Sequence, residues 1–238
     1  MENRTLWLRT ICSNNGFSAS DRQWELLAQY VLLLLDWNKK INLISRRDVE
    51  NVWGSHVLHS ISPLLELQLA QKSTLLDLGS GGGLPGIPLK ILRPDIRATL
   101  VDSTQKKIVA VRDIIQKLGL EGAEAVWGRA EDLGTSNRFR GMYNYVVARA
   151  VAPLKDLVKW GLPFLNKGQT ELAYDGRVEG RVVVDPPALI ALKGGDIEKE
   201  TRHAQEAPGV KSVKVINVAF KGSEQLLEND KKIIVVQF

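Results

Sequence analysis

The sequence predicts an α/β protein of the Rossmann-like class, with a mostly parallel sheet, a C-terminal antiparallel hairpin and an N-terminal helical cap. Three observations predict this arrangement. Apolar residues keep a helical spacing through the first 70 residues, and short apolar runs then alternate with amphipathic stretches as far as Leu165. Two strand-like segments, 212–218 and 231–237, close the chain.

The change of pattern near residue 73 divides the chain into a helical cap, residues 1–72, and a sheet domain, residues 73–238. No long Pro/Gly/Ser linker separates the two parts, so we expect one integrated unit. In the cap, Ser20 followed by Gln23 is a capping-box start. The helix that follows carries apolar residues from Trp24 to Leu35, and a second helix is predicted over 49–69.

The sheet domain shows the alternation expected of βαβ units. Strands are predicted at 74–78, 98–101, 123–127 and 143–148, and helical segments at 89–92, 106–118 and 153–165. The last two strand-like segments are joined by a turn-rich stretch without a convincing helix, which indicates a hairpin at the edge of the sheet. A parallel sheet closed in this way is typical of S-adenosylmethionine (SAM)-dependent methyltransferases.

One stretch does not fit the alternation. Residues 169–187 hold two short apolar runs, Leu172–Tyr174 and Val182–Val184, and the pattern leaves open whether either joins the sheet.

Composition excludes several classes of protein. The chain has 238 residues with 44% hydrophobic and 25% charged residues, an ordinary mixture for a globular protein. The lone cysteine, Cys12, cannot form an internal disulfide, and the apolar run Val31–Leu35 is far too short to span a bilayer. No leader sequence is evident, so we expect a cytoplasmic protein without a membrane partner.

The positive charge is unevenly distributed. The net charge is +5, and residues 73–168 hold 14 basic against 9 acidic side chains, which accounts for the whole excess. A polyanionic partner facing this third of the chain is one interpretation, and a solvated lysine-rich surface is the other.

A glycine-rich loop follows the first predicted strand and precedes a helix. Gly79, Gly81 and Gly83 allow a sharp turn and a close approach of the backbone to a ligand, whereas the alternative is a plain tight turn. Asp102 ends the next strand, where a carboxylate can accept ribose hydroxyls, and Glu131 follows the third strand. Together these features predict an adenosine-containing cofactor, and the G-x-G-x-G spacing favours SAM over NAD.

The chain resembles the RsmG (GidB) family of ribosomal RNA methyltransferases from about Trp24 to Phe238. The most specific segments are Trp37-Asn38-Lys39-Lys40-Ile41-Asn42-Leu43-Ile44-Ser45, Trp53–Ser60 with His56, Leu84-Pro85-Gly86, Asp102-Ser103, Arg149-Ala150-Val151-Ala152 and Leu192-Lys193-Gly194-Gly195-Asp196. The resemblance implies a SAM-dependent enzyme that makes 7-methylguanosine in the 530 loop of 16S rRNA, with the small ribosomal subunit as partner. His59 departs from the family pattern, in which many members have Asp.

The resemblance also implies which residues act. Those expected to contact SAM, together with the loop glycine Gly81, are Gly79, Leu84, Asp102, Ser103, Thr104, Ala130, Glu131 and Arg149. Those expected near methyl transfer are the basic residues Lys106, Arg129, Arg149 and Lys193. For Arg149, an ion pair with Glu131 or Asp132 is the structural alternative.

The chemistry requires no proton acceptor, because guanine N7 presents a lone pair. Accordingly, no His/Asp or Cys/His pair stands out, no metal site is predicted, and His56 is interpreted as a packed, hydrogen-bonded core residue. Two other functions remain: an NAD(P) oxidoreductase, and a non-catalytic RNA-binding or ribosome-assembly protein that keeps the fold. The sequence does not reveal an oligomeric state, and we assume a monomer.

Overall fold

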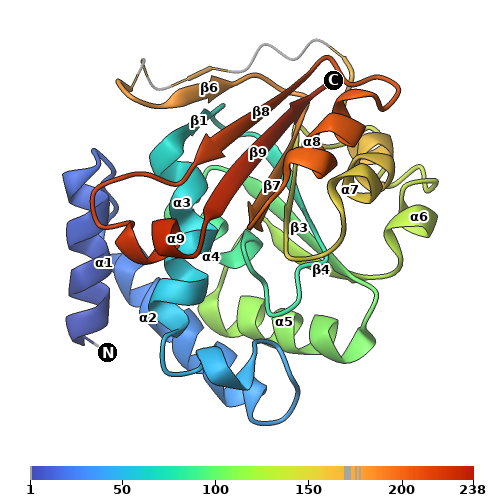
Figure 1. Ribbon diagram of the computed structural model, residues 1–238. Coiled ribbons are helices and arrows are strands. Elements are labelled where there is room, and N and C mark those ends of the chain that lie inside the picture. Colours follow the sequence, from blue (N-terminus) through green and yellow to red (C-terminus); the bar gives the residue numbers. More distant parts are fainter. Residues whose placement is uncertain (1, 169–172, 175, 177) are drawn as a thin grey trace.

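A seven-stranded sheet forms the centre of the molecule in the computed structural model, which describes residues 2–168, 173–174, 176 and 178–238 (Figure 1). Its strand order is β4-β3-β2-β5-β7-β9-β8. The strands are β2 (Thr74–Leu78), β3 (Arg97–Asp102), β4 (Ala123–Trp127), β5 (Tyr145–Arg149), β7 (Ala188–Gly194), β8 (Ser212–Asn217) and β9 (Lys231–Gln237). The first five in this order are parallel, whereas β9 runs antiparallel between β7 and β8.

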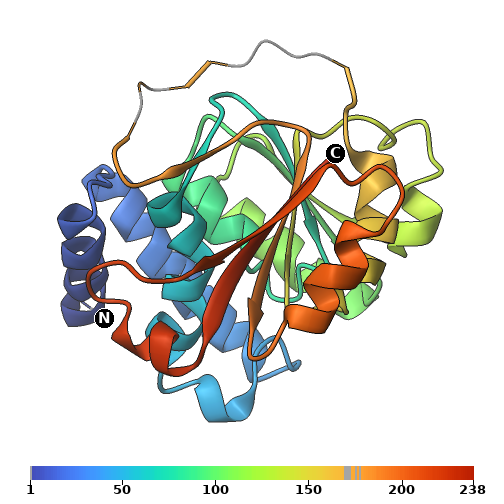
Figure 2. The ribbon, with the colours of Figure 1, turned by 45° about the horizontal axis from the view of Figure 1, so that its top comes forward.

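Helices cover both faces of this sheet (Figures 1 and 2). They are α1 (Glu2–Asn14), α2 (Asp21–Asn38), α3 (His59–Glu66), α4 (Gly86–Leu92), α5 (Gln105–Leu118), α6 (Ala130–Leu133), α7 (Leu154–Gly161), α8 (Glu198–Gln205) and α9 (Glu224–Glu228). Shorter turns are the 3₁₀ helices η1 (Arg46–Asp48) and η3 (Leu162–Phe164) and the π-helical turn η2 (Trp53–Leu58). Helices α2 to α5 lie on one face, and α6 to α8 lie on the other.

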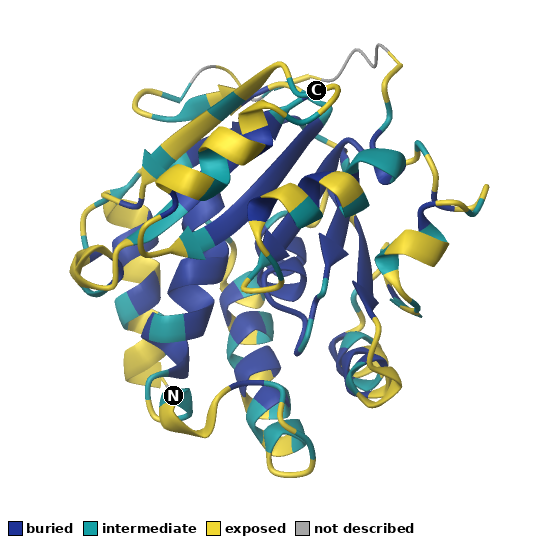
Figure 3. Ribbon diagram, turned by 45° about the vertical axis from the view of Figure 1, so that its right-hand side comes forward, coloured by how far each residue is buried: buried dark blue, intermediate teal, exposed yellow. Residues whose placement is uncertain are grey.

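Burial on both faces explains why the central strands read as continuous apolar runs. Alternate residues point to opposite faces, so Leu75 and Tyr145 pack into one hydrophobic cluster while Leu76 and Val146 pack into a second. The central strands β2, β5 and β7 are correspondingly buried along most of their length (Figure 3). The first cluster also contains residues of α1, α2 and α3, so the cap and the sheet share one core.

Most predicted elements are confirmed, including 74–78, 123–127 and 231–237 to the residue. The capping box is present: the Ser20 side chain accepts a hydrogen bond from Gln23 N, and the Gln23 side chain accepts one from Ser20 N. The C-terminal hairpin is also present, with β8 at the sheet edge. No helix among the described residues is long and apolar enough to cross a membrane.

Three expectations are corrected. The helix predicted over 49–69 ends at Glu66, and β1 (Leu67–Leu69) pairs in parallel with β6 (Val182–Val184) in a separate two-stranded sheet. Val182–Val184 therefore lies outside the main sheet, whereas Leu172 lies outside the described residues. Tertiary pairing overrides helical spacing here, because all three residues of β1 are buried.

The other two corrections concern the C-terminal third. The prediction lacked β7, which is the fifth parallel strand, and α8. The stretch between the last two strands is not free of helix, because α9 forms there, with the buried Leu226 as its anchor.

Candidate functional site

The glycine loop connects β2 to α4 and has left-handed backbone at three positions. The φ angles are +73° at Gly79, +55° at Gly81 and +91° at Gly83, a region that residues with a Cβ rarely adopt. A Cβ on Gly79 would lie 2.7 Å from Cγ2 of Val151. The N–H groups of Gly79 and Ser80 donate to the carbonyl of Val101, which ties the loop to β3. Glycine at position 79 is thus required both by φ and by space.

Asp102 fixes the loops on either side of the end of β3. Its Oδ2 accepts a hydrogen bond from Gly81 N at 3.0 Å, and its Oδ1 accepts one from Thr104 N at 2.7 Å. The side chain is buried, with 7% exposure. Bonds to a carboxylate are stronger than bonds between neutral groups, so Asp102 holds the two loops in register.

A cavity of about 240 Å³, here called the β3 cavity, opens at the carboxyl ends of β2, β3 and β4. Open α/β sheets bind ligands at this edge. Six predicted site residues line it: Gly79, Asp102, Ser103, Arg129, Ala130 and Glu131. Val151 and Trp160 line it too, and the sequence analysis did not assign them to the cofactor site.

A second cavity of about 460 Å³, here called the Arg149 cavity, lies at the carboxyl ends of β5 and β7. Arg149 Nη1 is 3.1 Å from Nδ1 of His56, and His56 Nε2 is 3.2 Å from Oδ2 of Asp48. Burial, and secondarily the Arg149 charge, lower the pKa of His56 to about 4. A neutral His56 that accepts from Arg149 at Nδ1 carries its proton on Nε2, facing Asp48.

Several buried polar atoms around the glycine loop and Arg149 have no hydrogen-bond partner among the described residues. They are Asp77 Oδ1, Ser80 Oγ, Arg149 Nε and His59 Nε2. Buried polar groups normally find partners. They lie near the carboxyl edge of the sheet, where open α/β sheets bind ligands.

The remaining predicted residues lie in different places. Lys193 lines the Arg149 cavity, but its ammonium donates to Glu200 Oε2 and to the carbonyl of Ala152, both at 2.7 Å. Lys106 is exposed in the first turn of α5. Leu84 is buried and Thr104 is exposed, and these two residues and Lys106 line neither cavity.

Several residues of the Arg149 cavity were not predicted from the sequence. His56 is buried and hydrogen-bonded, as interpreted, but its partner Arg149 was not predicted. His59, Asn229 and Lys231 were not predicted to line a site. The alternative of an ion pair between Arg149 and Glu131 or Asp132 is wrong for the described structure, because Arg149 points instead to His56.

Asp77 is expected to make stability depend on pH. Complete burial raises its pKa from 3.8 to about 7, although Gly86 N donates to Oδ2 at 2.8 Å. The folded state then binds more protons than the unfolded state between those values, so Asp77 makes the free energy of unfolding decrease as pH rises from about 4 to 7.

The substitution Asp77→Asn keeps the shape of the side chain but removes its charge. As pH rises from 4 to 8, we expect the free energy of unfolding of this variant to increase by about 2 to 4 kcal/mol relative to that of the wild type, measured by urea unfolding. The histidines with lowered pKa values titrate in both proteins, so their contribution cancels in the difference. Parallel pH profiles for the two proteins would contradict the assignment of a neutral-range pKa to Asp77.

Comparison with known proteins agrees with this geometry. The family described as rRNA small subunit methyltransferase G (GidB) matches residues 23–185. The chain belongs to this family. Its relatives named ribosomal RNA small subunit methyltransferase G include that of Moorella thermoacetica, 35% identical over 82% of each chain. That of Chlorobium limicola is 41% identical over 84% of this chain and 80% of the relative.

Solved structures place the fold of this GidB-family chain among SAM-dependent methyltransferases, as predicted. Geranyl diphosphate C-methyltransferase from Streptomyces coelicolor A3(2) superposes with a TM-score of 0.53 at 10% identity, over 92% of this chain and 97% of that one. A SAM-dependent methyltransferase from Aquifex aeolicus has a TM-score of 0.50 at 13% identity, over 81% and 97%. These relatives and structures support neither the oxidoreductase nor the non-catalytic alternative.

Proposed function

We propose that this protein transfers the methyl group of SAM to N7 of a guanine in the 530 loop of 16S rRNA, within the small ribosomal subunit. The observation that carries the proposal is that six residues predicted for cofactor binding or methyl transfer, far apart in the sequence, line the β3 cavity beside the glycine loop. The relatives' name supports RNA of the small subunit as the substrate. We further propose a cytoplasmic monomer.

The residues present fit SAM. Asp102 at the end of β3 suits ribose hydroxyls, and Ala130 and Glu131 suit the adenine edge. The close approach that Gly79 allows admits a ligand against the loop. Towards β5, the guanidinium of Arg149, which lines the neighbouring cavity, offers a positive charge for the carboxylate of an amino acid. When bound, SAM supplies an electrophilic methyl group.

The Arg149 cavity is then the place for the target base. Guanine N7 needs no general base, so the protein's work is to align N7 with the methyl carbon and to exclude other geometries. Arg149 and Lys193 line this cavity, and a guanidinium can pair with the O6 edge or stack on the ring. Arg129, beside the β3 cavity, and Lys106, on the first turn of α5, are proposed to hold neighbouring phosphates.

The test uses labelled SAM and small subunits that lack their own 7-methylguanosine. We expect label at one guanine N7 in the 530 loop, mapped by cleavage at the modified base, with protein-free 16S rRNA as a parallel substrate. SAM binding without transfer to either substrate would leave the non-catalytic alternative. Absence of SAM binding would overturn our interpretation of the glycine loop.

A further inference from the structure

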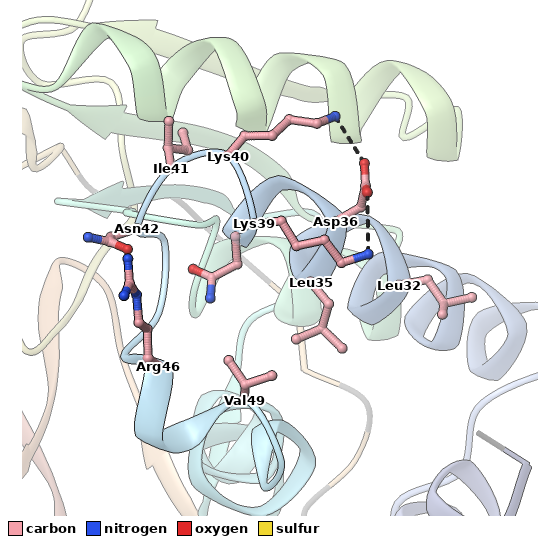
Figure 4. A pocket seen from close by; sticks show the side chains of 10 residues that line it. Leu32, Leu35, Asp36, Lys39, Lys40, Ile41, Asn42, Arg46 and Val49 are labelled. Atoms are coloured by element: carbon pink, nitrogen blue, oxygen red, sulfur yellow. Dashed lines mark hydrogen bonds and ion pairs between the residues drawn. The ribbon is translucent and has the colours of Figure 1, made fainter.

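A third cavity in the described part of the chain lies away from the β3 cavity and the Arg149 cavity. This cap groove, about 790 Å³, is formed by the C-terminal half of α2, the loop after it, and η1 (Figure 4). Its lining residues are Leu32, Leu35, Asp36, Asn38, Lys39, Lys40, Ile41, Asn42, Arg46 and Val49. Neither cofactor binding nor methyl transfer, as proposed above, uses any of them.

The groove combines an apolar floor with a basic rim. Leu35 of α2 and Val49 point toward each other across it in Figure 4, and Leu32 beside them is 53% exposed. The rim carries Lys39, Lys40 and Arg46 against a single carboxylate. Single-stranded nucleic acid is bound in this way, with apolar surface against a base and cations against the phosphates.

The charges of the rim are only partly neutralised. Asp36 serves both lysines, with Oδ2 at 3.1 Å from Lys40 Nζ and Oδ1 at 3.8 Å from Lys39 Nζ. Arg46 is exposed and has no hydrogen bond or ion pair from its side chain within the described residues. The lysines also lie at the C-terminal end of α2, where cations are favourable. That helix-end effect accounts for Lys39 and Lys40, but not for Arg46, which belongs to another element.

One turn of helix links the groove to the methyl-transfer site. Arg46 and Asp48 are the two ends of η1, and Arg46 lines the cap groove while Asp48 lines the Arg149 cavity beside His56. The two cavities therefore lie at opposite ends of one short turn. A strand lying in the groove therefore passes within a few nucleotides of the Arg149 cavity.

We propose that the cap groove binds the single-stranded ribosomal RNA that flanks the target guanine. Lys39 and Arg46 contact phosphates, and the apolar floor contacts a base or sugar. This inference rests on the proposed function for the identity of the RNA. The groove thereby supplies substrate affinity from the cap, whereas the glycine loop and Arg149 hold the reacting groups.

The test compares the double variant Lys39→Gln/Arg46→Gln with the wild type for binding to protein-free 16S rRNA and to small subunits lacking 7-methylguanosine. We expect about tenfold weaker binding near 0.15 M salt, and a slope of log K against log salt that is smaller by about 1.4, because two phosphate contacts are lost. The KM for RNA should rise by more than kcat falls. Lys211→Gln/Lys214→Gln replaces two exposed lysines, one just before β8 and one within it, and is the charge-matched control that should bind as the wild type does.

A variant of opposite sign strengthens the test. Asp36→Asn frees both lysines and should tighten RNA binding a few-fold, which a purely structural role of these residues would not produce. If the double variant binds RNA with the affinity and salt slope of the wild type, the proposal that the cap groove binds RNA is wrong. Weaker binding to subunits with unchanged binding to protein-free RNA would also overturn it, in favour of a ribosomal-protein contact. Both outcomes concern RNA binding, so they differ from the absence of methyl transfer that would overturn the proposed function.

Discussion

Replacing Arg149 by alanine is expected to lower the rate of methyl transfer by at least about 100-fold, because it removes a preorganised donor beside the reacting groups. Stability should change by only about 1 kcal/mol. The guanidinium is desolvated, which lowers its own pKa, so its removal also relieves a cost. Asp77 loses a nearby cation, but its pKa, already about 7, rises further and the carboxyl takes up a proton instead of remaining as a buried charge.

Steady-state kinetics with labelled SAM and urea unfolding of the same preparations measure the two effects separately. Arg140→Ala removes an exposed arginine and should transfer methyl groups normally. Arg149→Lys keeps the charge without the planar fork and should recover only part of the rate. His56→Ala removes the acceptor for Arg149 Nη1 and should lower kcat about tenfold with little change in SAM affinity. Near-normal turnover by Arg149→Ala would remove Arg149 from the active site.

The grouping of residues that line the β3 cavity could be predicted from the sequence because its signals are local. Gly79 directly follows β2, Asp102 ends β3 and Glu131 lies in α6 shortly after β4, and the carboxyl ends of neighbouring parallel strands meet at one edge. The order of a strand, the loop that follows it and the next helix places each of these residues in the fold to within a few sequence positions. The prediction therefore needed the order of elements and no knowledge of their packing.

The other half could not be predicted in the same way. Arg149 and His56 are 93 residues apart, and they meet because the π-helical turn η2 and the end of β5 line the same cavity. Lys231 reaches the Arg149 cavity because β9 pairs with β7. The strand β7 was not predicted from the sequence, so this neighbour of β9 could not be foreseen. The ion pair of Lys193 with Glu200 depends on α8, which was also missed. These contacts are decided by tertiary pairing, which local spacing does not specify.

Replacing Asp102 by alanine is expected to weaken SAM binding about 100-fold, measured by calorimetry. The carboxylate accepts from Gly81 N and Thr104 N, and hydrogen bonds to a charged acceptor contribute about 1.5 to 3 kcal/mol each. Asp102→Asn offers one amide oxygen for two N–H groups, so we expect about tenfold weaker binding than the wild type. Glu121→Ala removes an exposed acidic side chain and should bind SAM normally.

A role confined to holding the loops can be separated from direct contact with the cofactor. If the Asp102 carboxylate also accepts a ribose hydroxyl, an analogue without that hydroxyl binds the wild type more weakly but loses little further affinity in Asp102→Ala. If Asp102 only fixes the loops, the two losses add, because the changes then affect independent contacts. We expect non-additive losses, since Asp102 lines the β3 cavity while it holds Gly81 and Thr104. Additive losses would show that Asp102 only holds the loops, and that another residue of the cavity contacts the ribose.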